Sequence, residues 1–194
     1  SFYSGLSQKS ILQYNLDVPN YFFWKELLRE KNGQTIGRLD SRYLGIDKNE
    51  AGSSPDYNAE LSSWLHSFTP AINHYIKNEL KFVTDVKYNM FGPVRPWNND
   101  NDNTRDDLRS AMAQNPYLMV LNQSGYYDGA TTYFNAKYTL SQIDPSGKMK
   151  ERLKFKGYRS GHMMYLRKED LIQANEDLRE FIRESASNGK PAKY

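Results

Sequence analysis

Asp128 and His162 carry side chains suited to acid–base chemistry, and each stands close to a glycine in a short loop. Gly125 lies in the loop at 124–128 that Asp128 closes, and Gly161 directly precedes His162. A glycine permits a sharp turn that can aim a functional side chain over the edge of a sheet. A carboxylate beside an imidazole holds one ring nitrogen as N–H and leaves the other to take a proton from a nucleophile. The two residues are therefore the leading candidates for a functional site in this sequence.

Segments typical of β-strands precede both residues. The apolar run at 117–121 is typical of a strand covered on both faces in a parallel sheet, and residues 152–158 alternate as a second strand. Open α/β sheets bind their ligands just beyond the carboxyl ends of such strands. A lone Asp is usually a turn residue and a lone His usually packs or faces solvent, but the pair at successive strand ends favours a functional site.

Helices are predicted before and after the second strand. Residues 131–143 carry apolar side chains at the three- and four-residue spacing of one helix face, and residues 168–185 repeat that stripe. We therefore predict an α/β fold for residues 104–194, with a parallel βαβ unit and a terminal helix. Two strands do not complete such a sheet, so we expect a missing upstream part of the core, or another chain, at the exposed sheet edge.

The first part of the chain, residues 1–103, is predicted to be mainly helical. One helix covers residues 19–31, because a proline begins it and an Asn-Gly pair follows its end. Trp64 lies in a second helical stretch, and Thr69 followed by Pro70 is typical of the start of a third helix.

The run at 98–103 consists only of Asn and Asp, and it predicts the boundary between the two parts of the chain. These side chains hydrogen-bond their own backbone and so favour turns over regular structure. Thr104 with Asp107 resembles a capping box that opens the next helix. That helix is expected to end near Asn115, because Pro116 disfavours helical geometry in the residue before it.

Arg38, Asp40 and Arg42 form a compact charged cluster within the first part. We expect the cluster to lock the helical region onto the core through ion pairs, or to meet a substrate. The aromatic stretch at 21–24 is more typical of a core or an interface than of a substrate cage.

Several longer motifs surround the candidate pair or lie upstream of it. They read Lys-Glu-Leu-Leu at 25–28, Gly-Arg-Leu-Asp-Ser-Arg-Tyr at 37–43, Asn-Pro-Tyr-Leu at 115–118, Ser-Gly-Tyr-Tyr-Asp at 124–128 and Gly-His-Met-Met-Tyr at 161–165. Together these motifs resemble the C-terminal portion of bacterial serine carboxypeptidases, a family of the α/β-hydrolase superfamily. The likeness spans nearly the whole chain. It departs from the family at 129–132, where Gly-Ala-Thr-Thr stands in place of the family's common Leu-Ala-Thr-Pro.

The resemblance implies a triad of Ser, Asp and His in that chain order, with Asp128 as the acid and His162 as the base. Met163 matches a family position that lines the pocket for the leaving group, and residues 1–103 are expected to include part of a helical cap over the active site. The family's nucleophile lies in a Gly-x-Ser-x-Gly elbow, and no serine of this sequence lies in one. The nucleophile is therefore expected upstream, and the chain alone is expected to be inactive.

The complete protein is accordingly expected to remove C-terminal residues from a peptide substrate through an acyl-enzyme. Ester hydrolysis and acyl transfer stay open, because the fold and the triad do not choose the substrate. A non-enzymatic alternative is a catalytically inactive interaction module whose unpaired strand edge recruits another chain.

Composition narrows the remaining classes of function. The chain has 38% hydrophobic and 25% charged residues, which is typical of a packed globular protein. Its net charge is +3, and its Lys and Arg residues are scattered, so it lacks the electrostatic pattern of a nucleic-acid binder. No apolar run approaches the length of a membrane span. Cysteine is absent, which leaves the compartment open, and a periplasmic or secreted location is compatible with the resemblance.

No metal or other cofactor is predicted from the sequence. His66 and His74 lack the surroundings typical of zinc ligands. Residues 100–104 alternate oxygen-bearing side chains, but they lack the turn glycine and the bidentate Glu of a calcium loop.

Overall fold

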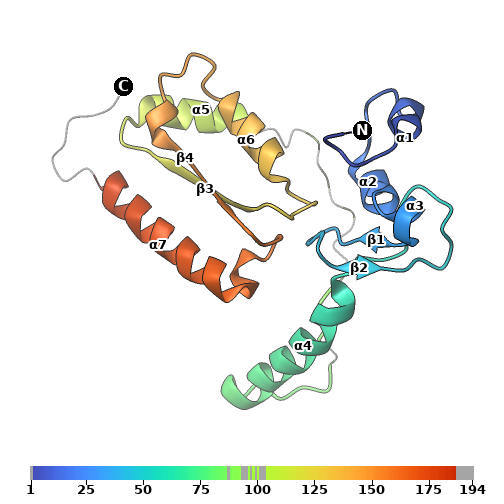
Figure 1. Cartoon of the computed structure of the whole chain (residues 1–194). Helices are drawn as coiled ribbons and strands as arrows, with labels where there is room; N and C mark the ends of the chain where they lie inside the picture. Colours follow the sequence, from blue (N-terminus) through green and yellow to red (C-terminus); the bar gives the residue numbers. More distant parts are fainter. Residues whose placement is uncertain are drawn as a thin grey trace.

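The computed structural model of the chain describes residues 2–86, 88–92, 96, 98, 100 and 104–186, and it combines helices with short strands (Figure 1). Most of the boundary predicted at 98–103 lies outside these residues, as does the middle of the calcium-like run at 100–104. The first half contains α1 (Gln8–Gln13), α2 (Asn20–Glu26), α3 (Arg29–Asn32), β1 (Thr35–Ile36), β2 (Leu44–Gly45), α4 (Leu61–His74) and the π-helical turn η1 (Tyr75–Glu79). The second half contains α5 (Arg105–Gln114), β3 (Val120–Gly125), α6 (Tyr133–Ser141), the 3₁₀ turn η2 (Lys150–Arg152), β4 (Leu153–Tyr158), the 3₁₀ turn η3 (Met164–Leu166) and α7 (Lys168–Ser185).

The helix predicted over 19–31 is divided into α2 and α3. Leu28 lies between them at φ −114° and ψ 1°, and it forms an antiparallel bridge with Gln34 that takes it out of helical geometry. Gly33 then ends α3 in the left-handed conformation, with φ 61°. The predicted end of the helix is confirmed, whereas its predicted continuity was wrong.

A short antiparallel hairpin, β1 with β2, follows α3, and the helical interpretation of residues 1–103 does not predict it. Each strand has two residues, too few to show an alternating pattern in the sequence. Lys25 of α2 holds the segment that follows β2, because its Nζ lies 2.5 Å from Asp47 Oδ2 and 2.7 Å from the carbonyl of Asn49. The side chains of Lys25 and Asp47 are both 1% exposed, so this ion pair is buried.

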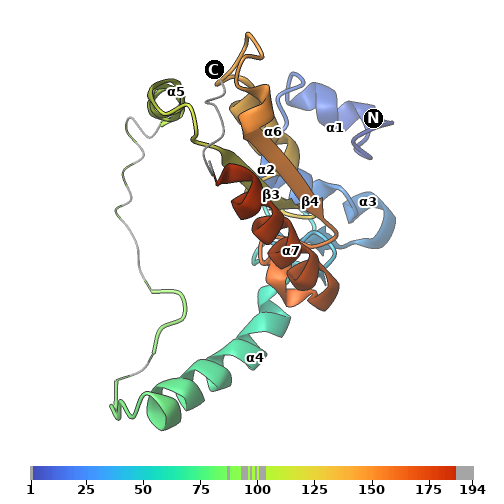
Figure 2. The same ribbon diagram turned by 90° about the vertical axis from the view of Figure 1, so that its left-hand side faces the viewer.

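The prediction that Thr69 and Pro70 open a separate helix was wrong, because α4 runs through both residues. A proline removes one N–H from the helical ladder, and here the helix continues despite that loss. Trp64 on the same helix is buried and meets the ring of Tyr43 edge to face at 5.7 Å. Beyond that contact, α4 projects away from the rest of the chain (Figure 2).

The second half forms the predicted strand–helix–strand–helix sequence. β3 and β4 pair in parallel, from Val120 with Leu153 to Gly125 with Tyr158, and α6 connects them. α7 occupies the predicted residues 168–185. β3 begins later than the apolar run at 117–121, because a turn at the end of α5 takes up the start of that run.

α5 begins after Thr104 and ends before Asn115, as predicted, but the expected capping-box hydrogen bond is absent at its start. Thr104 has φ −89° and ψ 8°, away from the extended geometry that directs a capping hydroxyl to the backbone. Arg152 fixes the other end of α5, where its Nη1 donates to the carbonyl oxygens of Met112, Asn115 and Leu118.

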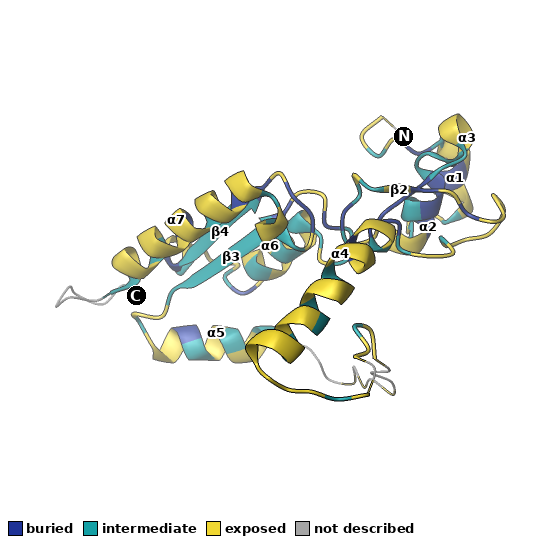
Figure 3. Cartoon of the chain, turned by 90° about the horizontal axis from the view of Figure 1, so that it is seen from below, coloured by how far each residue is buried: buried dark blue, intermediate teal, exposed yellow. Residues whose placement is uncertain are grey.

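The parallel sheet lies between α6 on one face and α7 on the other (Figure 1). Met112, Ile143 and Tyr158 are buried beside it, yet β3 and β4 are mostly half-exposed (Figure 3). Helices therefore lie on both faces of the sheet, as expected, but their cover leaves most of β3 and β4 half-exposed. Within the described residues, β3 and β4 pair only with each other, which leaves one edge of each strand open.

None of the helices in the described residues combines the length and the apolar character that crossing a membrane requires.

Candidate active site

Asp128 and His162 lie in contact beyond the carboxyl ends of β3 and β4. The Nδ1 atom of His162 is 2.9 Å from Oδ2 of Asp128, which is hydrogen-bond distance. The Asp128 side chain is only 5% exposed, whereas the His162 side chain is 44% exposed. The carboxylate is thus fixed inside the protein, and the imidazole lies between it and the surface.

The turn that follows Asp128 holds its carboxylate in one orientation. Oδ1 accepts hydrogen bonds from the backbone N–H of Ala130 at 2.8 Å and of Thr131 at 3.0 Å. Oδ2 accepts a third bond from the hydroxyl of Thr131 at 2.6 Å, besides its contact with His162. A carboxylate with this many donors cannot rotate without breaking several hydrogen bonds.

The loops that follow β3 and β4 extend the pairing of the two strands. Tyr126 N–H donates to the carbonyl of Tyr158 at 2.9 Å, and Tyr127 N–H donates to that of Ser160 at 3.0 Å. A Cβ atom on Gly125 would collide with the backbone carbonyls of Ser160 and Gly161. Gly125 therefore allows close approach of the two loops, and it does so without a positive φ.

Residues 38–41 of the first half, which we call the brace segment, bind both loops through their backbone. The carbonyl of Leu39 accepts from His162 N–H at 2.7 Å, and the carbonyl of Arg38 accepts from Gly129 N–H at 2.9 Å. Ser41 N–H donates to the carbonyl of Tyr127 at 2.9 Å. The brace segment therefore fixes the positions of both candidate residues relative to the helical region.

The charged cluster holds the brace segment in shape. Arg42 donates to both oxygens of Asp40, at 2.9 Å and 2.6 Å, and to the carbonyl of Arg159 at 2.8 Å. The hydrogen bond to Asp40 raises the pKa of Arg42 above its ordinary value. The guanidinium also lies over the ring of Tyr127, 4.9 Å from its centre. These contacts match the expected role of the cluster in locking the helical region onto the core.

Glu60 binds the backbone of the brace segment through its buried carboxyl group. It is fully buried, and its Oε1 accepts from the backbone N–H of Leu39 at 2.9 Å. Burial raises the pKa of Glu60 above its usual range, and two backbone hydrogen bonds reduce that effect. Its Oε2 has no hydrogen-bond partner among the described residues. Nothing in the sequence around Glu60 distinguishes it from an exposed glutamate.

A cavity of about 270 Å³ adjoins the acid, between α2 and the start of α6. Aromatic rings from both helices and from the loop after β3 line most of it: Phe23, Trp24, Tyr126, Tyr127, Tyr133 and Phe134. Asp128 and Gly129 also line the cavity, whereas His162 and Met163 do not. Met163 follows the base, is half-buried, and precedes η3.

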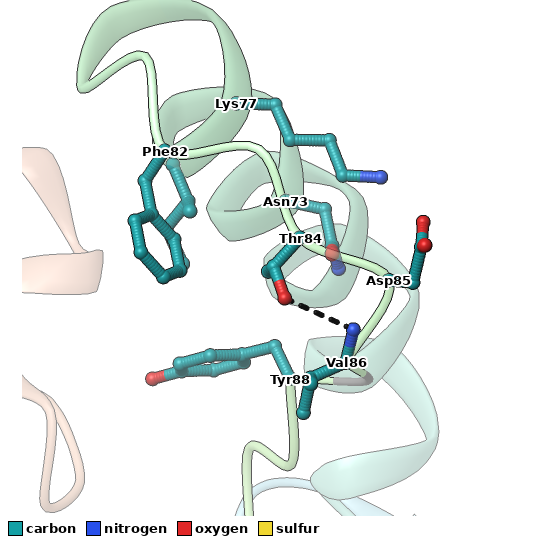
Figure 4. Close-up of a pocket in the computed structure, with 8 residues that line it drawn as sticks. Asn73, Lys77, Phe82, Thr84, Asp85, Val86 and Tyr88 are labelled. Atoms are coloured by element: carbon teal, nitrogen blue, oxygen red, sulfur yellow. Dashed lines mark hydrogen bonds between the residues drawn. The ribbon is translucent and has the colours of Figure 1, made fainter.

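A larger cavity of about 560 Å³ lies away from the candidate pair, between α4 with η1 and the segment that returns along them (Figure 4). One continuous stretch of chain, residues 73–88, supplies its lining. Its interior shows a local hydrogen bond from Val86 N–H to the hydroxyl of Thr84 at 3.1 Å. Neither Asp128 nor His162 lines this cavity, so the volume of a cavity does not by itself identify the candidate active site.

Among the described residues, no group of three or more His, Asp or Glu side chains lies close enough to hold a metal ion. His66 is exposed on α4, and Nδ1 of His74 contacts the side-chain amide of Asn78 at 3.0 Å.

Comparisons of this chain with family models, curated proteins and solved structures find no match. The resemblance to serine carboxypeptidases therefore stays a prediction, which depends on the quoted motifs and on the contact between Asp128 and His162.

Proposed function

We propose that this chain supplies the acid and the base of a serine-type hydrolase that removes C-terminal residues from peptides. The observation that carries the proposal is the 2.9 Å contact between Asp128 Oδ2 and His162 Nδ1 beyond two parallel strands. This arrangement is typical of α/β enzymes, which bring functional side chains together at the carboxyl ends of neighbouring strands. It also agrees with the order of Asp before His in hydrolases of this fold.

In the proposed reaction, His162 acts through Nε2, the ring nitrogen that does not face Asp128. Nε2 takes the proton of the serine hydroxyl as the hydroxyl oxygen attacks the substrate carbonyl. Asp128 stabilises the imidazolium that forms, because its fixed carboxylate already faces Nδ1. The imidazolium then returns the proton to the leaving amine, and the same two residues assist the attack of water on the acyl-enzyme.

The nucleophile and the oxyanion hole would come from sequence outside this chain, because no Gly-x-Ser-x-Gly elbow occurs in it. The open edges of β3 and β4 support this part of the proposal, since a two-stranded parallel sheet is far smaller than such a fold requires. In the same proposal, α4 and the hairpin of the first half belong to a cap, and Met163 contacts the leaving group.

A direct test joins this chain to the upstream sequence that the proposal requires, with its Gly-x-Ser-x-Gly elbow, and measures hydrolysis of blocked dipeptides. We expect His162→Ala to lower kcat/KM by at least about 10³-fold, because it removes the group that carries the proton, and Asp128→Asn by a similar factor, because it removes the carboxylate that stabilises the imidazolium. His66→Ala is the matched control, since it removes an exposed imidazole from α4 without touching the pair.

Unchanged turnover in His162→Ala contradicts the assignment of the base. A panel of peptides, esters and acyl acceptors given to the same protein separates peptide hydrolysis from ester hydrolysis and acyl transfer. An extended chain that folds and hydrolyses none of these substrates would favour the inactive interaction module.

A further inference from the structure

We propose that Thr131 is a positioning residue that selects the tautomer of His162. This inference rests on the proposed base role of His162, because only a bare Nε2 can accept a proton. Thr131 does not stand out in the sequence as a functional residue, since threonine is common at the start of helices. Its contacts in the structure are what single it out.

Thr131 Oγ1 forms a closed triangle with Asp128 and His162. It lies 2.6 Å from Asp128 Oδ2 and 3.3 Å from His162 Nδ1, and that carboxylate oxygen lies 2.9 Å from the same nitrogen. Three polar atoms thus meet within hydrogen-bond reach of one another. The contact of 2.6 Å is in the range of a hydroxyl that donates to a carboxylate.

The hydroxyl of Thr131 has a single proton, which it donates in its hydrogen bond to Asp128 Oδ2. An ionised carboxylate only accepts hydrogen bonds, so the hydroxyl must be the donor in the 2.6 Å contact. The lone pairs of Thr131 Oγ1 are then left to face His162 Nδ1. A nitrogen without a proton at this place would meet two oxygen acceptors and no donor.

A protonated Nδ1 resolves this conflict. Its N–H donates mainly to Asp128 Oδ2, and Thr131 Oγ1 becomes a second, more distant acceptor. In the neutral imidazole, a proton on Nδ1 leaves Nε2 bare. Thr131 and Asp128 together therefore favour the tautomer that general-base catalysis requires.

The backbone sets the position of the hydroxyl. Thr131 N–H donates to Asp128 Oδ1 at 3.0 Å, so the backbone and the side chain of one residue bind the two oxygens of one carboxylate. This double attachment orients the carboxylate plane toward the imidazole. Serine can reproduce both bonds, whereas valine keeps the shape of threonine and loses the hydroxyl bond.

The test measures the ring tautomer of His162 by ¹⁵N NMR in the 194-residue chain, at about pH 9, where imidazoles are neutral. His162→Gln assigns the ring signals. We expect Thr131→Val to lower the ratio of Nδ1–H to Nε2–H tautomer by roughly tenfold, the effect of losing one charge-assisted hydrogen bond. Thr131→Ser should keep the ratio of the parent chain within about twofold.

Thr132→Val is the matched control, because this neighbouring hydroxyl makes no hydrogen bond within the described part of the chain. The ratio of the two His162 tautomers in this variant should equal that of the parent. A parent-like ratio in Thr131→Val overturns the inference, and so does an equal fall in Thr131→Val and Thr131→Ser. If valine disturbs the amide spectrum of the fold, Thr131→Ala replaces it in the same comparison.

Asp128→Asn separates this inference from the proposed function. A parent-like ratio in Asp128→Asn means that the carboxylate does not direct the imidazole, which removes the basis of both proposals. A changed ratio in Asp128→Asn with an unchanged ratio in Thr131→Val leaves the acid–base pair intact and overturns the role of Thr131 alone.

Discussion

The environment of single side chains decides what the charged groups near the candidate site can do. Asp128 is buried and satisfied, because backbone, hydroxyl and imidazole donors surround it. Glu60 is buried and only partly satisfied, because one of its oxygens lacks a partner among the described residues. Burial therefore raises the pKa of Glu60 above its ordinary value.

Glu60→Gln tests the cost of ionising this buried carboxyl. The pKa of Glu60 is raised in the folded chain, so its contribution to stability is full below about pH 4.3, the ordinary value for Glu, and is lost as pH rises through the folded value. Glutamine imitates the protonated acid. Compared with the parent, the variant should gain free energy of unfolding between pH 4 and 8, measured by urea denaturation.

Glu30→Gln is the charge-matched control for this experiment, because it removes one negative charge from the exposed face of α3. A difference between Glu60→Gln and the parent that stays constant over this pH range contradicts a buried, destabilising charge at Glu60.

Among the elements of the fold, α7 contacts the sheet through the buried carboxylate of Asp177. Asp177 accepts from the hydroxyl of Tyr158 at 2.8 Å and pairs with Lys156 of β4 at 3.0 Å. Burial alone would raise the pKa of Asp177, but hydrogen bonds from Lys156, Tyr158 and Gln173 outweigh it and lower the pKa below the ordinary value. The stability that α7 gains from Asp177 is therefore present at neutral pH and is lost in acid.

Asp177→Asn should lower the free energy of unfolding by about 1–3 kcal/mol at pH 7, because it removes the charged acceptor for Lys156 and Tyr158. The difference from the parent should shrink as pH falls below about 3.9, the ordinary value for Asp, and through the lower folded pKa. Urea denaturation from pH 2.5 to 7 checks this. Glu180→Gln is the control, since Glu180 meets Lys156 only at 3.8 Å and is 63% exposed. Equal losses in the two variants at pH 7 would contradict a special role for Asp177.

Elements with a strong local pattern could be predicted from the sequence, and elements set by distant contacts could not. The periodic stripe of α7 and the proline after Asn115 fixed those helix boundaries correctly. The break at Leu28 depends on a bridge to Gln34, and the passage of α4 through Pro70 overrides a local start signal. The bridge at Leu28 leaves no periodic trace in the sequence, and nothing in the local pattern shows that α4 continues through Pro70.

The same distinction applies to the candidate site. Asp128 and His162 could be found because functional residue types stood at successive strand ends, and the structure brings them into contact. Thr131, Leu39 and Glu60 could not be found. Thr131 acts through a short hydrogen bond from its hydroxyl, and Leu39 acts through its backbone carbonyl. Neither contact leaves a pattern in the sequence, and Glu60 is distinguished only by its burial.

At the scale of the whole molecule, exposed large apolar side chains outnumber buried ones among the residues that the structure describes. The core among the described residues is small, and large hydrophobic residues are exposed along the segment after η1 and along α7. In the segment after η1, side chains between 58% and 82% exposed include Leu80, Phe82, Val83, Val86 and Phe91. We expect another protein segment to cover apolar side chains that are exposed to this extent.

We expect the isolated chain to bind a hydrophobic dye such as ANS and to self-associate at tens of micromolar, because this apolar segment and the strand edges are uncovered. Sedimentation velocity at several concentrations, together with dye fluorescence, measures both effects. The double variant Phe82→Ser, Val83→Ser should reduce dye binding by about half or more. Leu12→Ser, which removes an apolar side chain 66% exposed on α1, should leave it nearly unchanged. A monomer that binds no dye would contradict an uncovered interface.

The brace segment has a consequence for how this protein can tolerate sequence drift. Its bonds to the two loops run from main chain to main chain, so the identity of Leu39 contributes nothing to the bond it offers to His162. Gly161 is different, because any side chain there would strike the carbonyl of Leu39 and the side chain of Asp40. Position 39 can therefore accept many amino acids, whereas position 161 accepts only glycine. A library randomised at both positions should return varied residues at 39 and glycine at 161.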